Sequence, residues 1–440
     1  MKKLFGTDGI RGTVNEYPMV PEIALKLGIS LGQISNKPKI VIGKDTRLSG
    51  YIFEYSLSSG ICAAGGEVLF VGVLPTPAIA YLTKKYNADA GVVISASHNS
   101  AKDNGIKLFS SEGFKLPDEK EKEIEHKMFS QLILNSNTGK AFKMKNAKRE
   151  YIEFVKKAVE YIDLKELKIV LDCANGAAYY VAPTILKELG AEVITLNHIP
   201  NGENINDNCG ALFPKNISHL VKKNKADIGI CLDGDADRII VLDEKGNIVD
   251  GDKIMYICSK YLSQKNKLKN NTLITTVMSN EGLIKALKEE NINVERTKVG
   301  DRYVIEKIKE LGCNFGGEQS GHIIFTDYTT TGDGIISGLL LLKIIKETGK
   351  KISELLEGLE IYPQKLINLK IKEKKDLMDM PKVIKKIEEA EKELKKEGRV
   401  LIRYSGTEKK VRVMVEGKDL ELVNKHVNII SEEIKKEIGI

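Results

Sequence analysis

One recurring pattern limits the fold of this 440-residue chain: a short apolar segment, then a polar loop, then a longer helical pattern. The apolar segments are residues 40–42, 68–71, 91–94, 169–171, 228–230 and 273–277. Several of them run directly into polar loops, at residues 43–47, 95–99, 172–176 and 233–238. Apolar strands separated by helices are typical of parallel or mixed sheets with helices on both faces. We therefore predict an α/β fold, with ligands at the carboxyl ends of the strands.

The last part of the chain follows a different pattern. Residues 367–371 alternate apolar and polar side chains, and a mixed-charge helix is predicted over 381–396. Two further strands are predicted over 400–404 and 411–415, and an amphipathic helix over 419–437. We interpret this part as a small α+β domain.

The length of the chain corresponds to about three domains, at about 150 residues each. We place boundaries near residues 150, 250 and 365, and a Lys/Glu-rich stretch near 365–380 sets the last domain apart. The predicted domains are residues 1–150, 151–250, 251–365 and 366–440.

Composition and charge disfavour several classes of partner. The surplus of seven positive charges is small for this length, the chain has no Trp, and 6% of its residues are aromatic. We therefore expect no nucleic-acid partner. The longest apolar stretch, 335–345, contains Lys343 and is too short to span a membrane. The first residues lack the apolar core of a signal peptide and the six cysteines form no C-x-x-C pair, so we expect a reduced, cytoplasmic protein.

Asp233, Asp235 and Asp237 follow an apolar strand and alternate with small residues. Three carboxylates at this spacing repel one another unless the loop curls around a cation, and a hard divalent cation is the natural partner. We exclude an EF-hand because Arg238 stands at loop position 6, where that motif has Gly, and because both flanks are strands. Magnesium is the cation that we predict, and an exposed acidic turn is the alternative.

Ser97 lies in a Ser-Ala-Ser-His-Asn loop directly after the strand at 91–94. A hydroxyl beyond a strand end suits a nucleophile if a base or a metal activates it. His98 beside it and Lys107 further along are candidates for a proton acceptor and a positive charge. A simple serine-rich turn is the alternative, but serine, magnesium and lysine together are the parts of a phosphoryl-transfer site.

The loop between the last two predicted strands is a candidate phosphate site. It carries Arg403, Ser405, Gly406 and Thr407, and Arg412 follows on the next strand. Guanidinium forks, hydroxyls and the backbone amides of a glycine turn all bind phosphate. A plain hairpin turn fits these residues equally well.

A glycine-rich loop carries Glu318, Gln319, Ser320 and His322. Carboxylate, amide and hydroxyl groups suit the hydroxyls of a sugar, and His322 is either a proton carrier or a structural residue. None of the Gly-Lys pairs in the chain is followed by Ser or Thr, and H-E-x-x-H does not occur. The missing Walker loop disfavours P-loop nucleotide hydrolysis.

Together, these loops resemble the signature segments of the α-D-phosphohexomutase family, in the same order along the chain. The matching segments are residues 5–12, 94–99, 233–238, 317–322 and 403–408. They are similar to that family's opening motif, phosphoserine loop, magnesium loop, sugar loop and phosphate loop. The resemblance implies three similar α/β domains with mixed or parallel sheets and a smaller α+β carboxy-terminal domain, arranged around a central cleft.

The resemblance also implies an activity, in which a phosphoryl group moves between two positions of a hexose through a phosphoserine at Ser97 and a 1,6-bisphosphate. Gln319 favours the members that interconvert glucosamine 6-phosphate and glucosamine 1-phosphate, a step that supplies UDP-N-acetylglucosamine synthesis. The implied cofactor is Mg²⁺, held by Asp233, Asp235, Asp237 and Ser97.

The remaining roles rest on the same resemblance. Arg11, Lys107 and His322 are the candidate catalytic residues beside Ser97. The candidate substrate-binding residues are Arg238, Lys298, Arg302, Glu318, Ser320, Arg403, Ser405, Gly406, Thr407 and Arg412. The implied partner is a small-molecule hexosamine phosphate, and the implied assembly is a monomer or a homodimer.

Alternative functions stay open at this point. A phosphomannomutase or phosphoglucomutase would use the same chemistry on another sugar. A metal-dependent phosphatase would also work through a seryl phosphate, but it would release inorganic phosphate. A catalytically inactive sugar-phosphate-binding protein is disfavoured, because every reactive side chain is present.

Overall fold

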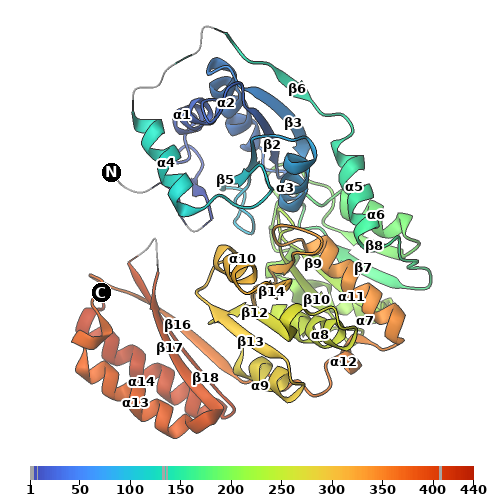
Figure 1. Ribbon diagram of the computed structural model, residues 1–440. Coiled ribbons are helices and arrows are strands. Elements are labelled where there is room, and N and C mark those ends of the chain that lie inside the picture. The colour runs from blue at the N-terminus through green and yellow to red at the C-terminus, as the bar shows by residue number, and fades with distance from the viewer. Residues whose placement is uncertain (1–3, 7, 131–133, 135–136, 406–408) are drawn as a thin grey trace. The chain divides into compact units, whose positions relative to one another are not determined.

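The computed structural model describes residues 4–6, 8–130, 134, 137–405 and 409–440 of the chain (Figure 1). The chain forms two compact units, Met1–Val277 with Ile292–Glu357 and Met278–Asn291 with Gly358–Ile440. Among the described residues, three sheets lie in the first unit and one lies in the second.

The first sheet has six strands and contains the apolar segments nearest the start of the chain. In spatial order its strands are β1 (Ile10–Thr13), β5 (Asp103–Ser110), β4 (Ala90–Ile94), β2 (Lys39–Lys44), β3 (Glu67–Val73) and β6 (Ala141–Lys143). The helices of this part are α1 (Pro21–Leu31), α2 (Gly50–Ala63), α3 (Thr76–Lys85) and α4 (Asp118–Phe129). Every residue of β4 is buried, as expected for an apolar strand that is covered on both faces.

The second and third sheets follow along the chain. The second has the order β11 (Ile248–Val249), β10 (Ile239–Leu242), β9 (Ile228–Leu232), β7 (Lys168–Asp172) and β8 (Glu192–Leu196). The third has the order β13 (Asn293–Thr297), β12 (Thr272–Thr276), β14 (Phe315–Gly317) and β15 (Ile323–Phe325). The accompanying α-helices are α5 (Ala147–Ala158), α6 (Val181–Glu188), α7 (Ser218–Lys223), α8 (Gly251–Gln264), α10 (Asp301–Glu310), α11 (Gly334–Thr348) and α12 (Ile352–Leu355). Short 3₁₀ helices occupy Gly210–Leu212, Pro214–Ile217 and Lys269–Asn271.

The same four-strand arrangement recurs in all three sheets. It reads β3-β2-β4-β5 in the first, β8-β7-β9-β10 in the second and β13-β12-β14-β15 in the third. In each case the first three strands are parallel and the fourth is antiparallel. The predicted α/β class with mixed sheets is therefore confirmed. The loop between the third and fourth strands holds the same topological position in every sheet, at the carboxyl end of the parallel strands.

Helix α11 is the most apolar segment noted in the sequence, and its ends are well defined. The side chain of Asp333 accepts hydrogen bonds from the N–H groups of Ile335 and Ile336, and Gly349 ends the helix in the left-handed conformation. Most of α11 is buried within its unit. Within the described part of the chain, we find no helix that is both long enough and apolar enough to cross a bilayer.

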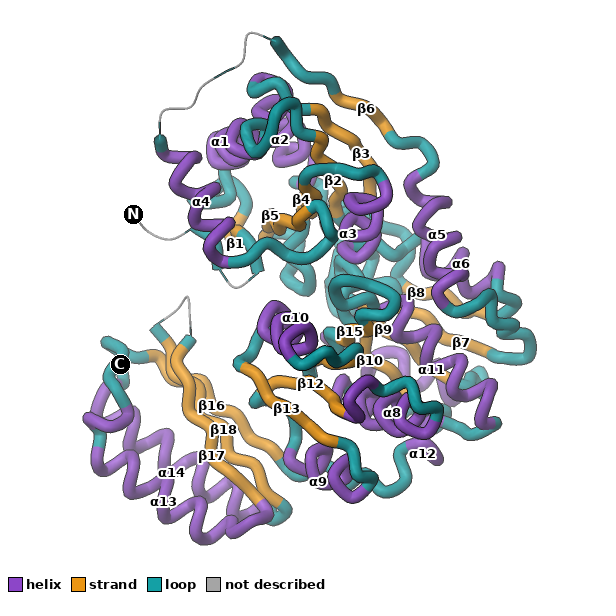
Figure 2. Tube along the Cα trace, in the orientation of Figure 1, coloured by secondary structure: helices purple, strands orange, loops and turns teal. Residues whose placement is uncertain are grey.

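The second unit is a three-stranded antiparallel sheet with helices. The sheet has the order β16 (Gln364–Lys370), β18 (Lys410–Gly417) and β17 (Gly398–Tyr404), and the helices are α9 (Glu281–Glu289), α13 (Pro381–Leu394) and α14 (Leu420–Ile438). Figure 2 shows α13 and α14 side by side along this sheet. Short 3₁₀ helices occupy Leu377–Asp379 and Lys395–Glu397.

The Lys/Glu-rich stretch that we used as a divider begins inside this unit. Its first residues form β16, which pairs with β18 over seven residues. Residues 365–370 of the stretch therefore belong to a strand, in which the alternating apolar residues Ile367 and Leu369 pack against the core of this unit. The second unit begins earlier, at Gly358, and also includes Met278–Asn291.

Candidate active site

The candidate nucleophile Ser97 lies in the loop between β4 and β5. It is 1% exposed, and its backbone has φ of +53°, in the left-handed region that costs a non-glycine residue free energy. Its Oγ donates a hydrogen bond of 2.6 Å to Oδ2 of Asp233. The serine and the aspartate come from equivalent loops of the first and second sheets, so the repeated topology brings together residues 136 positions apart.

Asp233, Asp235 and Asp237 form a buried cluster in the loop between β9 and β10. One oxygen from each carboxylate lies within 4.8 Å of the others. Oδ1 of Asp235 and Oδ1 of Asp237 are buried and accept no hydrogen bond from any described residue. Burial, together with repulsion from the other two carboxylates, raises the pKa of Asp233 well above its usual value. Three carboxylates, with two oxygens that accept no hydrogen bond from the described part of the chain, are suitable ligands for a hard divalent cation.

Lys107, on β5, supplies positive charge to this cluster. Its Nζ lies 2.8 Å from Asp235, 3.2 Å from Asp237 and 3.3 Å from Asp8. Burial acts to lower the pKa of Lys107, but these carboxylates outweigh it and raise the pKa well above the usual value. The side chain therefore remains a charged ammonium group at neutral pH. It is suited to stabilise a nearby negative charge rather than to accept a proton.

Asp8 and Lys115 extend the charged network beyond the aspartate cluster. Asp8 also forms ion pairs with Arg11 and Lys115, and Lys115 lies 2.6 Å from Asp301. Despite burial, the neighbouring lysines hold the pKa of Asp8 well below its usual value. Arg11 additionally donates to the backbone oxygen of Ala96, next to the nucleophile. The network therefore links the Ser97 loop to the start of α10.

His322 lies between two carboxylates. Its Nδ1 is 3.7 Å from Asp237 Oδ2 and its Nε2 is 3.3 Å from Asp301 Oδ2. The N–H of Gly332 donates to Nε2 at 3.1 Å, so the neutral ring carries its proton on Nδ1, towards Asp237. Burial opposes the charged ring, but Asp301 and Asp237 together raise the pKa of His322. The ring is therefore suited to hold or move a proton beside the aspartate cluster.

His98 and Arg238 lie close to the nucleophile. Nδ1 of His98 is 3.4 Å from Ser97 Oγ. Burial and the charges of Arg238 and Arg11 lower the pKa of His98 to about 4, so its ring is uncharged at neutral pH. Nε of Arg238 is buried and finds no hydrogen-bond acceptor among the described residues. This guanidinium therefore has a donor available for an incoming anion.

The candidate sugar loop connects β14 to β15. Oε1 of Glu318 accepts a hydrogen bond of 3.0 Å from the N–H of Gly300, which brings the loop next to the segment that contains Lys298. Both Ser320 and Lys298 are exposed. Arg302 points elsewhere: its guanidinium forms ion pairs with Asp118 and Glu121 of α4. The structure thus brings Glu318 next to Gly300. It pairs Arg302 with Asp118 and Glu121 instead.

The candidate phosphate residues of the second unit lie on one hairpin. Arg403 and Arg412 are direct partners across β17 and β18, so their side chains share a face of the sheet. Two guanidinium groups on one face can both donate to a single phosphate. Nε of Arg412 is buried without an acceptor among the described residues. Ser405 is buried at the end of β17, whereas Gly406 and Thr407 lie outside the described residues.

Two functional candidates were missed by sequence reasoning. Thr76, the first residue of α3, donates through Oγ1 to Asp235 Oδ2 at 2.6 Å and through its backbone N–H to the backbone oxygen of Asp235. Asn206 donates to the backbone oxygens of Ser97 and Asn99, both at 2.9 Å. Neither residue belongs to a recognisable motif, and their roles appear because the chain brings distant segments into contact.

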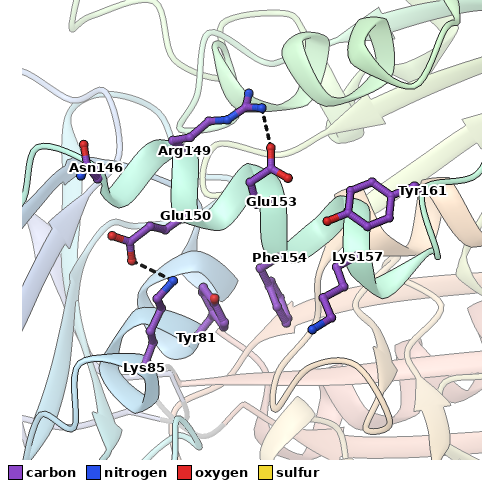
Figure 3. Close-up of a pocket in the computed structure, with 9 residues that line it drawn as sticks. All are labelled: Tyr81, Lys85, Asn146, Arg149, Glu150, Glu153, Phe154, Lys157 and Tyr161. Atoms are coloured by element: carbon purple, nitrogen blue, oxygen red, sulfur yellow. Dashed lines mark ion pairs between the residues drawn. The ribbon is translucent and has the colours of Figure 1, made fainter.

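A groove of about 730 Å³ between α3 and α5 lies apart from these residues (Figure 3). Its lining includes Lys85 and Arg149, which form ion pairs with Glu150 at 3.0 Å and Glu153 at 2.5 Å. The rings of Tyr81 and Phe154 stack on each other at 3.9 Å. These four charged groups are therefore paired within the groove, and none of the candidate site residues lines it.

The amino-acid sequence matches four family models in succession. They describe the phosphoglucomutase/phosphomannomutase α/β/α domains I, II and III, over residues 2–132, 149–246 and 250–362, and the C-terminal domain, over residues 366–433. Curated relatives include the phosphoglucosamine mutases of Pelobacter propionicus (53% identical, covering 100% of this chain and 99% of the relative) and Thermoanaerobacter pseudethanolicus (51% identical, covering 100% of both).

Solved structures show the same fold at lower identity. A phosphoglucomutase/phosphomannomutase family protein from Burkholderia thailandensis covers 100% of both chains with a TM-score of 0.81 and 23% identity. Aspergillus fumigatus N-acetylphosphoglucosamine mutase, solved with GlcNAc-6P and magnesium, covers 99% of this chain and 96% of its own with a TM-score of 0.69 and 19% identity. The chain therefore belongs to the phosphoglucomutase/phosphomannomutase family of α-D-phosphohexomutases.

Proposed function

We propose that this protein interconverts glucosamine 6-phosphate and glucosamine 1-phosphate by phosphoryl transfer through Ser97. The observation that carries the proposal is the 2.6 Å contact between Ser97 Oγ and Asp233, within a buried cluster of three carboxylates. A serine hydroxyl beside a divalent-cation site is the arrangement that phosphoryl transfer needs. The choice of an amino sugar rests on Gln319 and on the phosphoglucosamine mutases that are 51–53% identical over the whole chain.

The cofactor that we propose is Mg²⁺. The residues that would hold it are Asp233, Asp235, Asp237 and Ser97, and the two buried carboxylate oxygens of the cluster that accept no hydrogen bond from the described residues support this assignment. When bound, Mg²⁺ supplies positive charge that offsets the charge on the transferring phosphoryl oxygens. The magnesium in the Aspergillus fumigatus relative is consistent with this choice.

In the forward direction, the resting enzyme carries a phosphoryl group on Ser97. The O1 hydroxyl of glucosamine 6-phosphate forms a bond to that phosphorus, the bond from phosphorus to Ser97 Oγ breaks, and the O1 proton passes to a base. The resulting 1,6-bisphosphate then reorients. Ser97 Oγ forms a bond to the phosphorus at position 6, the bond from that phosphorus to O6 breaks, O6 takes back the proton held by the base, and glucosamine 1-phosphate leaves. The protein is thus returned to its phosphorylated state, with every phosphoryl group accounted for.

The cations around Ser97 stabilise the negative charge on the transferring phosphoryl oxygens. Lys107 stays charged because of its carboxylate neighbours, so we assign it a charge-stabilising role together with Arg11 and Arg238. His322 is our candidate for proton transfer, because its Nδ1–H lies beside the aspartate cluster and its pKa is raised by Asp301 and Asp237.

Substrate recognition is divided between two loops in this proposal. Glu318 and Ser320 bind the sugar hydroxyls, with Lys298 from the neighbouring segment, whereas Arg302 would have to leave its ion pairs with Asp118 and Glu121 to take part. The phosphate that is not being transferred binds the hairpin of the second unit, through the residues Arg403, Ser405, Gly406, Thr407 and Arg412. The placement of Arg403 and Arg412 opposite each other on adjacent strands supports this assignment, because both guanidinium groups can reach one anion.

Each predicted domain contributes one loop to this scheme. Residues 1–150 supply the phosphoserine loop, 151–250 the magnesium loop, 251–365 the sugar loop and 366–440 the phosphate loop. We propose a cytoplasmic location, because all six cysteines are free and most of them are buried.

The test is a substrate panel combined with intact-mass analysis. Purified protein is assayed with the 6-phosphates of glucosamine, glucose and mannose, with Mg²⁺ and the matching 1,6-bisphosphate. We expect the highest kcat/KM with glucosamine 6-phosphate, and a mass increase of one phosphoryl group that maps to Ser97. Faster turnover of glucose or mannose phosphate would assign another sugar, and release of inorganic phosphate without a bisphosphate requirement would assign a phosphatase.

A further inference from the structure

Arg47 is a completely buried residue that the mechanism above does not use. It follows β2, is 1% exposed, and lies in one of the polar loops that end the apolar strands. A buried guanidinium is costly unless its donors are satisfied. The identity of its acceptors therefore indicates what the residue does.

All five N–H groups of the guanidinium find acceptors. Nε donates to Oδ2 of Asp45 at 2.9 Å. The four remaining N–H groups reach backbone oxygens of the loop between β4 and β5, which belong to Ser97 (3.1 Å), Asn99 (2.8 Å), Asp103 (3.0 Å) and Ser100. Four carbonyl groups thus point at one side chain, and all of them come from the segment that carries the nucleophile.

Asp45 completes the connection from the other side of Ser97. Its Oδ2 also accepts a hydrogen bond of 2.6 Å from Oγ of Ser95, and that Oγ accepts a hydrogen bond of 2.9 Å from the backbone N–H of Ser97. Both the N–H and the C=O of Ser97 are therefore tied to the pair formed by Asp45 and Arg47.

From this geometry we propose that Arg47, oriented by Asp45, is a positioning residue that fixes the backbone of Ser97 for phosphoryl transfer. A left-handed backbone at a serine persists when surrounding contacts enforce it, and the φ of +53° at Ser97 is enforced on both sides. The contacts set the direction in which Oγ faces Asp233. This inference rests on the proposed function, since it assigns Arg47 to the same serine.

The residue type is specific for this task. Arginine presents five donors in a planar fork, whereas lysine offers three donors from a single nitrogen. Arg47→Lys keeps the positive charge beside Asp45 but cannot reach four separated carbonyls and the carboxylate. It therefore tests positioning without removing the buried charge.

A matched control variant alters a second buried ion pair, which includes the last residue of β2. Lys44 and Glu54 form another buried ion pair, 5% and 8% exposed at their side chains, and within the described residues neither side chain hydrogen-bonds to the Ser97 loop. The double variant Lys44→Met with Glu54→Gln removes this pair at similar volume. It disturbs the fold around β2 to a comparable degree without touching the carbonyl contacts.

The experiment compares wild type, Arg47→Lys and the control double variant by kcat, KM and thermal unfolding. We expect Arg47→Lys to lower kcat about 100-fold, because small misplacements of a reacting group cost about that much. The KM for glucosamine 6-phosphate should stay close to wild type, and the control should keep its kcat. A wild-type kcat in folded Arg47→Lys, a rise in KM alone, or an equal loss of kcat in the control would each overturn the proposal.

Ser95→Ala serves as a second variant if Arg47→Lys does not fold. It removes the acceptor of the Ser97 N–H and should lower kcat about tenfold at unchanged KM; a wild-type kcat overturns the proposal. The wild-type assay separates the two hypotheses. A wild type that turns over none of the hexose phosphates refutes the proposed function, whereas an active wild type with an equally active Arg47→Lys refutes the positioning role alone.

Discussion

The Ser97 region of the first unit and the arginine hairpin of the second unit both present groups suited to phosphate, but they are built differently. Around Ser97, the key groups come from loops of separate sheets, are buried, and are held by neighbouring residues. On the hairpin, Arg403 and Arg412 face each other on adjacent strands and are half-buried.

This difference separates residues that should act in the chemical step from residues that should act in substrate binding. A buried group whose orientation is enforced by several contacts contributes through geometry, so its loss should appear mainly in kcat. A partly exposed cation that meets the substrate contributes through charge, so its loss should appear mainly in KM. The following variants test this separation.

Ser97→Ala should have the largest effect, because it removes the hydroxyl that we propose as the carrier of the phosphoryl group. We expect kcat to fall on the order of 10⁴-fold or more, and the mass of one phosphoryl group to disappear from the purified protein. Ser100→Ala, an exposed serine of the same loop, should keep both activity and the added mass. Persistent phosphorylation in Ser97→Ala would place the modified residue elsewhere.

Asp235→Asn should have the second-largest effect, since it neutralises one carboxylate of the buried cluster. We expect kcat to fall about 100-fold or more and the Mg²⁺ concentration for half-maximal activity to rise. Asp207→Asn makes the same chemical change at an exposed position between β8 and the 3₁₀ helix Gly210–Leu212 and should behave like wild type. An unaltered Mg²⁺ titration in Asp235→Asn would remove this residue from the metal site.

Arg403→Ala tests the hairpin side of the comparison. A hydrogen bond to a charged group is worth about 1.5–3 kcal/mol, so we expect KM for sugar phosphates to rise about 10–100-fold with a smaller change in kcat. Lys365→Ala, which removes an exposed cation from the same sheet, serves as the control. If kcat fell instead of KM rising, the separation between the two regions would be wrong.

Thr76→Val should have the smallest effect, because it removes a single hydrogen bond, donated by an uncharged hydroxyl, to Asp235. We expect the apparent Mg²⁺ affinity to fall about tenfold, with kcat recovering at saturating Mg²⁺. Thr83→Val is matched, because Thr83 is buried on the same helix and its hydroxyl donates to the backbone oxygen of Ile79. Equal Mg²⁺ titrations in the two variants would assign Thr76 a structural role alone.

Local sequence determined much of the fold and the site. Continuously apolar runs such as 228–230 became buried strands, and the polar residues after them, including Asp233 and Ser97, became loops at strand ends. Such features depend on neighbours in the chain, because strand burial and turn formation follow from side chains a few residues apart. The α/β class and the candidate catalytic loops were therefore accessible from the pattern of residues.

The tertiary structure decided which residues support those loops. Residue identity revealed no repeat, whereas strand order shows the same four-strand arrangement three times. Arg47 contacts backbone oxygens about 50 positions away, and Thr76 contacts Asp235 across 159 positions. Nothing in a local pattern distinguishes these residues from other loop and helix-end residues. Their roles arise because folding brings distant donors to acceptors that burial has removed from water, and such groups must then be satisfied within the protein.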